Sequence, residues 1–258
     1  ALSSAASDVY KRQVIDFSTY QTYPLYIYSN LDYSNASNVS TKSSGKYYIT
    51  GTNNFNSIIV GNQAGYPTSP DIPITISGLN MRGELQINPI GEGSKVILTA
   101  AESHIGSITV ADGANLVLNL NGTLNVDFIS LGMGSTLTIM GGGMLNVIGV
   151  FTSKGSISIN GGTINANAGI SAVSLSLSRA NVSANNSSIT ASETLSMESS
   201  TVANAALFGF DNSASGPRTL ILSGNNIINH VERVGCSENC NARVTVSGID
   251  TAVSYTHL

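Results

Sequence analysis

Hydrophobic residues alternate with small polar residues along most of the chain, and one short pattern returns at nearly constant spacing. The stretch SISINGGTIN, which begins at Ser156, is an example. Ile157 and Ile159 are separated by one serine, two glycines follow, and Ile164 begins a second alternating run. Alternation with period two places the apolar side chains on one face of a strand. The stretch therefore predicts a short strand, a glycine bend and the start of another strand.

Nine copies of an apolar pair, with one residue between its members, divide the chain. The pairs are Ile74/Ile76, Val96/Leu98, Leu118/Leu120, Leu137/Ile139, Ile157/Ile159, Leu175/Leu177, Leu195/Met197, Leu220/Leu222 and Val244/Val246. The steps between first members are 22, 22, 19, 20, 18, 20, 25 and 24 residues. Six copies have glycine four positions after the first member: Gly78, Gly122, Gly141, Gly161, Gly224 and Gly248. A repeat of this length predicts a solenoid, in which each coil covers the next.

Each coil is expected to hold three short strands. A second inward-facing strand is predicted where six copies have an apolar residue seven positions after the first member: Met81, Met144, Ile164, Val182, Val202 and Ile227. A third is marked by Ile108/Val110, Val150 and Ile189. Strands of successive coils would pair in parallel about 4.8 Å apart, and Asn121, Asn160 and Asn165 are candidates for stacked amide ladders.

The predicted fold class is therefore all-β, a single-stranded parallel β-helix of about nine rungs of ~20 residues over residues 71–251. A β-sandwich of short strands is the alternative. The longer last steps predict two outward loops, near 204–218 (FGFDNSASGPR, Phe208 to Arg218) and 229–242 (HVERVGCSENC, His230 to Cys240). Insertions in solenoids leave the coil on the outside.

The N-terminal part, residues 14–70, differs in composition. Apart from one tyrosine near each end of the chain, all tyrosines lie between Tyr20 and Tyr66. This predicts a cap or irregular first rungs whose aromatic side chains cover open strand edges. The alternative is that exposed tyrosines stack on sugar rings.

The two ends of the chain differ in style from its interior. SSAASDVYKRQ (Ser3 to Gln13) and VSYTHL (Val253 to Leu258) resemble translated sequencing adapters that flank proteins from metagenomic assemblies. Residues 1–13 and 252–258 are therefore predicted to be non-native and are excluded from the fold prediction.

Charge and hydropathy narrow the function classes. Charged residues make up 10% of the chain and its net charge is −4, so it lacks the basic patch that nucleic acid requires. The stretch from Phe128 to Ser153 carries no charge and is long enough to span a membrane, but it contains six glycines and alternates with polar residues. It is therefore predicted to form strands, and the chain is not expected to be membrane-spanning or to bind nucleic acid.

Residues suited to catalysis are sparse. Between Gly113 and Thr190 the charged residues are Asp127, Lys154 and Arg179, one in each of three successive rungs. General acid–base catalysis needs at least two such groups within hydrogen-bond reach. A second cluster, Glu92, Lys95, Glu102 and His104, could supply two carboxylates for glycoside hydrolysis, but a solvated loop is the simpler interpretation. We therefore expect no catalytic residue, no metal site and no cofactor.

The two cysteines are four residues apart. Cys236 and Cys240 lie beside Glu232 and Glu238, but a zinc site would need a further Cys or His pair. A small disulfide loop is the preferred interpretation, with free thiols as the alternative, and it would imply an oxidising compartment.

The repeats resemble rungs of filamentous-haemagglutinin-like and autotransporter-passenger β-helix proteins of bacteria. The resemblance is carried by SKGSISINGGTINANAGISAVSLSLS (residues 153–178) and NSSITASETLSMESSTV (residues 186–202), and its style extends from Ile72 to Gly248. It implies a right-handed parallel β-helix that is secreted or exported to the cell surface beyond the outer membrane. There it would act without catalysis as a stalk or adhesin, contacting host or bacterial surface glycans or proteins.

The alternative function is a polysaccharide-binding or polysaccharide-degrading β-helix, either a lyase or hydrolase or a tailspike-like protein. Polygalacturonase-like enzymes carry Asn-Thr-Asp, Asp-Asp, Gly-His-Gly and Arg-Ile-Lys strings, and this sequence contains none of them. Calcium-dependent lyases need several acidic residues on one stacked face, where the middle rungs offer Asp127. An ice-binding solenoid would need a regular threonine ladder, and Thr136, Thr138 and Thr163 are not repeated at the same offset in neighbouring rungs.

Overall fold

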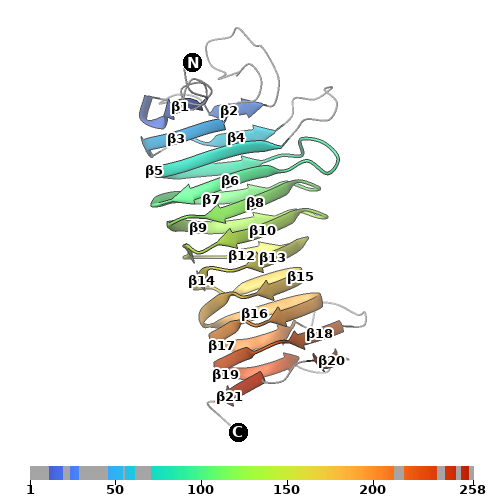
Figure 1. Cartoon of the computed structure of the whole chain (residues 1–258). Coiled ribbons are helices and arrows are strands. Elements are labelled where there is room, and N and C mark those ends of the chain that lie inside the picture. The colour runs from blue at the N-terminus through green and yellow to red at the C-terminus, as the bar shows by residue number, and fades with distance from the viewer. Residues whose placement is uncertain are drawn as a thin grey trace, which may run out of the picture.

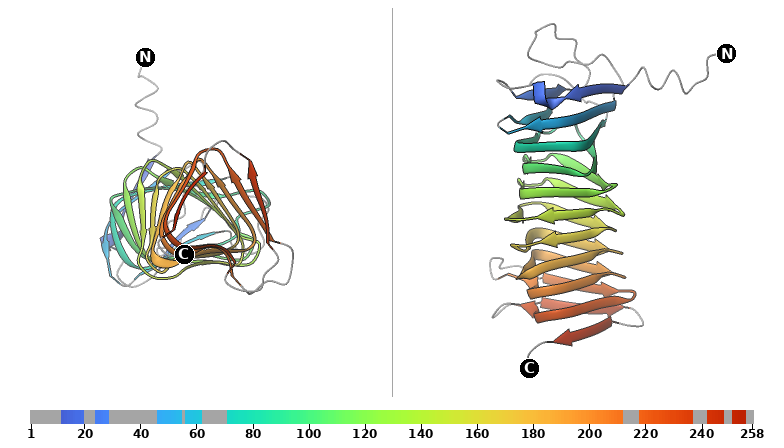
Figure 2. Two further views of the ribbon diagram at one scale, coloured as in Figure 1. Left: turned by 90° about the horizontal axis from the view of Figure 1, so that it is seen from below. Right: turned by 90° about the vertical axis from the view of Figure 1, so that its left-hand side faces the viewer.

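The computed structural model describes residues 12–19, 24–28, 46–54, 56–61, 71–211, 218–236, 242–247 and 251–255. Over these residues the chain is almost entirely β-strand, wound into coils of about 21 residues that stack in one column (Figure 1). Seen along the column, the coil is three-sided (Figure 2). All strand pairs between coils are parallel, for example between Leu137 and Ile157, which confirms the predicted parallel β-helix.

One side of the column, called the first face, carries the repeated apolar pair. Its strands, or the parts of longer strands that reach it, are β1 (Arg12–Asp16), β3 (Lys46–Asn53), β5 (Ile72–Ile87), β6 (Val96–Ala101), β8 (Asn115–Leu120), β10 (Thr136–Gly141), β13 (Ser156–Asn160), β15 (Ile170–Ser178), β16 (Asn181–Glu198), β18 (Arg218–Ser223) and β20 (Ala242–Ser247). The nine predicted copies correspond to the nine strands from β5 to β20.

The other two sides, the second and third faces, follow in chain order. Their strands are β2 (Leu25–Tyr28), β4 (Ile58–Gly61), β7 (Ser103–Val110), β9 (Thr123–Leu131), β11 (Met144–Val147), β12 (Phe151–Ser153), β14 (Thr163–Ala166), β17 (Thr201–Phe210), β19 (Asn226–Cys236) and β21 (Thr251–Tyr255). The long strands turn a corner and serve two faces. The described residues contain one helix, the three-residue 3-10 helix η1 (Phe17–Thr19). No helix of the described residues is long and apolar enough to span a membrane.

The register of two predicted copies was wrong by two residues. Leu98 pairs with Ile74 and with Leu118, and Leu118 pairs with Ile139, so the equivalent pairs are Ile72/Ile74 and Leu116/Leu118. Both copies contain three alternating apolar residues, and all three point inward. A shift of two residues keeps every side chain on the same face, so the pattern alone could not choose the register.

Three residues predicted to face inward are exposed instead. Met144, Ile227 and Val150 expose 38%, 50% and 53% of their surface, and the next residue of each, Leu145, Ile228 and Phe151, is buried in the core. Leu145 pairs with Ile164, and Ile139 pairs with Ile159. Leu145 lies six residues after Ile139, whereas Ile164 lies five residues after Ile159. The bend that precedes Met144 is therefore one residue longer. The other predicted second-strand residues, Met81, Ile164, Val182 and Val202, are buried.

Most bends after the first face place a residue in the left-handed backbone region, although neither Asn121 nor Gly122 does so in the bend after β8. Gly141 and Gly161 have φ of 102° and 98°, which confirms why glycine recurs there. Where the sequence has no glycine, Arg179 and Ser199 take the same region with φ of 51° and 46°. Glu102, with φ of 41°, does the same after β6, so three coils form this bend with a strained residue.

The first long step does not begin with a loop at residue 204. Strand β17 continues to Phe210, and its last residues pair with Ile189 and Ala191 on the third face. Phe208 and Phe210 are fully buried, so they are core residues of this coil. Arg218 likewise belongs to β18, and the segment 212–217 lies outside the described residues. The second predicted loop is shortened in the same way, because β19 runs to Cys236.

The described strands before residue 71 continue the column. Strand β1 pairs with β3 and β3 with β5, while β2 pairs with β4 and β4 with β5. Of the tyrosines, Tyr47 is buried on the first face, whereas Tyr20, Tyr23, Tyr33 and Tyr66 lie outside the described residues. The described part of residues 14–70 therefore forms first rungs. At the other end, the backbone of Val253 and Ser254 pairs with β19.

Candidate functional site

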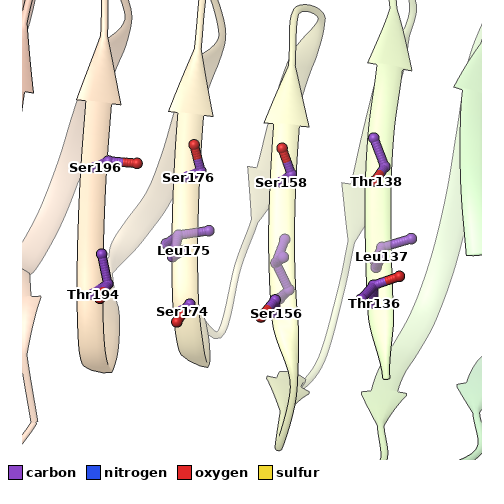
Figure 3. A pocket seen from close by; sticks show the side chains of 11 residues that line it. Thr136, Leu137, Thr138, Ser156, Ser158, Ser174, Leu175, Ser176, Thr194 and Ser196 are labelled. Carbon is purple, nitrogen blue, oxygen red and sulfur yellow. The ribbon is translucent and has the colours of Figure 1, made fainter. Parts of the chain in front are cut away.

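Two columns of hydroxyl side chains cover the outside of the first face over four successive coils. They come from β10, β13, β15 and β16, whose outward residues stand in register (Figure 3). One column contains Thr136, Ser156, Ser174 and Thr194, and the other contains Thr138, Ser158, Ser176 and Ser196. Strands of neighbouring coils lie about 4.8 Å apart, so four coils extend each column over about 14 Å.

The space between the columns is an open hollow of about 320 Å³, here called the first-face trough. It is lined by the eight hydroxyl residues together with Leu137, Ile157 and Leu175, which lie between the columns. Because the side chains of these three residues point into the core and are buried, backbone forms the floor of the trough. In the second column, the residue that pairs with Thr138 in the preceding coil is Val117, and the residue that pairs with Ser196 in the following coil is Ile221. Neither has a hydroxyl, so this column is four residues long.

The hydroxyls of the trough are mostly available for a ligand. Thr136 donates to Asn115 at 2.7 Å and Ser158 donates to Asn160 at 3.4 Å. Within the described part of the chain, no protein partner is bound by the other six hydroxyls, those of Thr138, Ser156, Ser174, Ser176, Thr194 and Ser196. A hydroxyl can both donate and accept. None of the residues lining the trough is charged, so its chemistry suits a neutral polar ligand that lies along the column.

The sequence prediction missed this array because it searched for threonine alone. Thr136 and Thr138 are not repeated as threonines, but a hydroxyl residue stands on both sides of the first apolar residue in four copies. The signal is visible in the strings TLT, SIS, SLS and TLS. An ice-binding threonine ladder is still not formed, since five of the eight positions are serine.

A ladder of amides lies on the second face. Asn146 donates its side-chain amide to Asn125, and Asn165 donates to Asn146, both at 2.8 Å. The prediction was therefore correct for Asn165. It was wrong for Asn121, which lies in an exposed bend, and for Asn160, which is exposed at the end of β13, because neither takes part in the ladder. A buried or half-buried amide ladder stabilises the stacking of coils because each bond joins one coil to the next.

The structure brings His104 and Asp127 together, although 23 residues separate them. Nε2 of His104 lies 3.1 Å from Oδ1 of Asp127, and Nδ1 lies 3.3 Å from Oδ1 of Asn80. The three residues come from successive coils, in β5, β7 and β9. Sequence distance concealed the pair, because one turn of the coil separates residues that touch. A histidine beside one carboxylate can hold or transfer a proton, but it has no nucleophilic side chain among its hydrogen-bond partners.

Three of the four residues Glu92, Lys95, Glu102 and His104 contact residues of neighbouring coils. Lys95 lies 3.9 Å from Asp71 of the preceding coil, and Glu102 accepts a bond from the backbone of Thr123 in the next coil at 3.1 Å. His104 faces Asp127 instead. Lys95, Glu102 and His104 therefore each join one coil to another. No group of three or more potential metal ligands occurs in the described residues.

Cys236 lies at the end of β19 and is disulfide-bonded. Its expected partner Cys240 and the neighbouring Glu238 lie outside the described residues.

Comparisons with models of protein families, with curated proteins and with solved structures found no match to this chain.

Proposed function

We propose that this chain is a non-catalytic attachment segment of a bacterial β-helix protein, secreted or displayed on the cell surface, that binds an extended neutral polysaccharide in the first-face trough. The observation that carries the proposal is the array of eight hydroxyls in register over four coils, six of them without a protein partner among the described residues. A polymer lying along the column could meet the same hydrogen-bonding groups in each coil.

The neutrality and shape of the trough support a polysaccharide over a charged partner. Sugars present many hydroxyls that donate and accept, which matches the serine and threonine side chains of the trough. A single neutral hydrogen bond contributes only about 0.5–1.5 kcal/mol. Binding that depends on many weak contacts along a rigid surface is therefore the expected mode, and it would strengthen with polymer length.

The test is adsorption of the purified protein to a panel of neutral polysaccharides, including cellulose, chitin, a β-1,3-glucan and an α-mannan. Replacing Ser158 and Ser176 with isoleucine should remove two hydroxyls, fill the trough without adding an aromatic ring, and reduce adsorption at least tenfold. Both positions face outward in β-strands, where isoleucine is well tolerated. The matched control is Thr201→Ile, at an outward position at the start of β17, which should adsorb like the wild type.

Equal adsorption of the wild type and the double isoleucine variant would contradict the proposal, as would adsorption to none of the polymers. The degradative alternative is favoured by one observation, the contact of His104 with Asp127. Release of reducing or unsaturated sugars from the panel, abolished by Asp127→Asn or Glu102→Gln, would establish it and overturn the non-catalytic proposal.

A further inference from the structure

A second surface, on the corner between the second and third faces, exposes apolar side chains that the core does not require. Phe128, Ile148 and Val150 expose 53%, 57% and 53% of their surface. The inward positions beside them are already filled by Ile129, Val147 and Phe151, which are buried. The three exposed residues are called the Phe128 patch. They come from two successive coils, since the backbone nitrogen of Ile129 bonds to the carbonyl of Val150 at 2.9 Å.

The ring of Phe128 is held by a glycine of the next coil. A Cβ atom added to Gly149 would lie 2.4 Å from Cε1 and 2.7 Å from Cδ1 of the ring. The absence of a side chain at Gly149 therefore lets the ring lie against the backbone between Ile148 and Val150. This arrangement places one aromatic and two aliphatic side chains on a common platform at the surface.

Polar groups without a full set of partners border the patch. Asp127 precedes Phe128 and gives only Oδ1 to His104, so its other oxygen accepts no bond from the described residues. Asn125, two residues before Asp127, accepts a bond from Asn146, while its own amide nitrogen has no partner in the described chain. Residues two apart on a strand share a face, so this acceptor and this donor lie beside the platform.

We propose that the Phe128 patch is a binding site for one pyranose ring of a neutral sugar. A pyranose has a face of C–H groups, which packs on an aromatic or aliphatic platform, and an edge of hydroxyls. Asp127 can accept a strong hydrogen bond from such a hydroxyl, and the amide of Asn125 can donate one. The patch and its polar border supply both halves of this chemistry side by side. The site lies on another face from the first-face trough and does not depend on it.

The experiment uses the full chain with isotope-labelled isoleucine and valine methyl groups. Methyl β-glucopyranoside, methyl β-galactopyranoside and methyl α-mannopyranoside are titrated separately while the methyl resonances of Ile148 and Val150 are followed. At least one glycoside should shift both resonances, with a Kd on the order of millimolar because a single ring offers few contacts. Phe128→Ser should weaken that binding about tenfold or more. Serine is a suitable replacement because Ser107 occupies the paired position one coil earlier.

Two further variants distinguish the effect of the position of the Phe128 ring from a general effect of exposed apolar side chains. Gly149→Ala keeps Phe128 but displaces its ring, and it should weaken binding as Phe128→Ser does. Met133→Ser removes an apolar side chain that is 67% exposed elsewhere, and it should leave the titration unchanged. Failure of all three glycosides to shift the resonances would overturn the proposal, as would shifts that persist in Phe128→Ser. Self-association that is lost in Phe128→Ser would instead assign the patch to a second copy of this chain. Because the trough is untouched, none of these results bears on polysaccharide adsorption through the first face.

Discussion

At the scale of single residues, the backbone conformation of the bends decides which residues are favourable there. Of the six glycines that the repeat predicted, Gly78, Gly141, Gly161 and Gly224 have positive φ, Gly122 does not, and Gly248 lies outside the described residues. The same positions in other coils hold Glu102, Arg179 and Ser199, whose side chains make that conformation costly. A sequence search for glycine alone therefore underestimates how regular the bend is.

Replacing Arg179 with glycine should stabilise the protein. A non-glycine residue in the left-handed region is strained by about 1–3 kcal/mol, and glycine regains this at an entropic cost of about 0.5–1 kcal/mol. The expected net gain in the free energy of unfolding is about 1 kcal/mol, measured by urea denaturation. Ser176→Gly, three residues earlier within β15 and without positive φ, should instead destabilise. A loss of stability in Arg179→Gly would show that the bend is not strained.

The hydrogen bonds that side chains make at the bends could not be predicted from the hydrophobic pattern. Asn226 is buried and accepts a bond from the backbone of Ser200, one coil earlier, at 3.1 Å while it donates to the carbonyl of Ser223 at 2.8 Å. Ser200 in turn binds the backbone of Ala180 at 3.0 Å. These contacts join residues 20 and 26 positions apart, so they became visible only once the register was known.

At the scale of strands, the inward face was predictable and the register was not. Alternation identified Ile157, Ile159 and their equivalents as core residues, and they are buried. Alternation cannot distinguish two registers that differ by two residues, which explains the error at Ile74/Ile76 and Leu118/Leu120. The prediction also failed at Phe208 and Phe210, where the longer step between copies suggested a loop, although both rings fill the core.

Ile159 tests the packing of these strands. Ile159 is fully buried and pairs with Ile139 and Leu177 of the two neighbouring coils. Ile159→Asp would bury an unpaired charge, and we expect a loss of more than about 4 kcal/mol in the free energy of unfolding. Amide hydrogen exchange should accelerate in β10 and β15 as well as in β13, because each coil is stabilised by its neighbours.

The control for this variant is the adjacent outward position. Ser158→Asp introduces the same charge on the same strand, but its side chain faces solvent and should cost about 1 kcal/mol or less. Equal stability of the two aspartate variants would contradict the assignment of inward and outward faces.

At the scale of the whole molecule, the coil brings together residues that the sequence separates by about 21 positions. His104 and Asp127, Asn125 and Asn146, and Thr136 and Asn115 all meet in this way. The period was visible in the sequence, so such pairs could be found by comparing residues one coil apart. The exact partner of each residue could not be found in this way, because the number of residues from one coil to the next varies from 18 to 25 between β13 and β18.

The candidate site was hidden for a related reason. The trough has no residue that is unusual by itself, because serine and threonine are common throughout this chain. Its character comes from the register, which aligns eight of them in two columns over four coils. The stacked array, and not any single side chain, is what would recognise a polymer.

The most direct test of this account locates the binding face with a fluorescent reporter. Because Cys236 is disulfide-bonded, a single added cysteine can be labelled with an environment-sensitive dye. The labelled positions are Ser158→Cys in the trough and Thr201→Cys at an outward position at the start of β17. Addition of a soluble oligosaccharide of the polymer that adsorbs the protein should shift the emission at Ser158→Cys to shorter wavelength and leave Thr201→Cys unchanged. A shift at Thr201→Cys with none at Ser158→Cys would contradict the assignment of the first face as the binding surface.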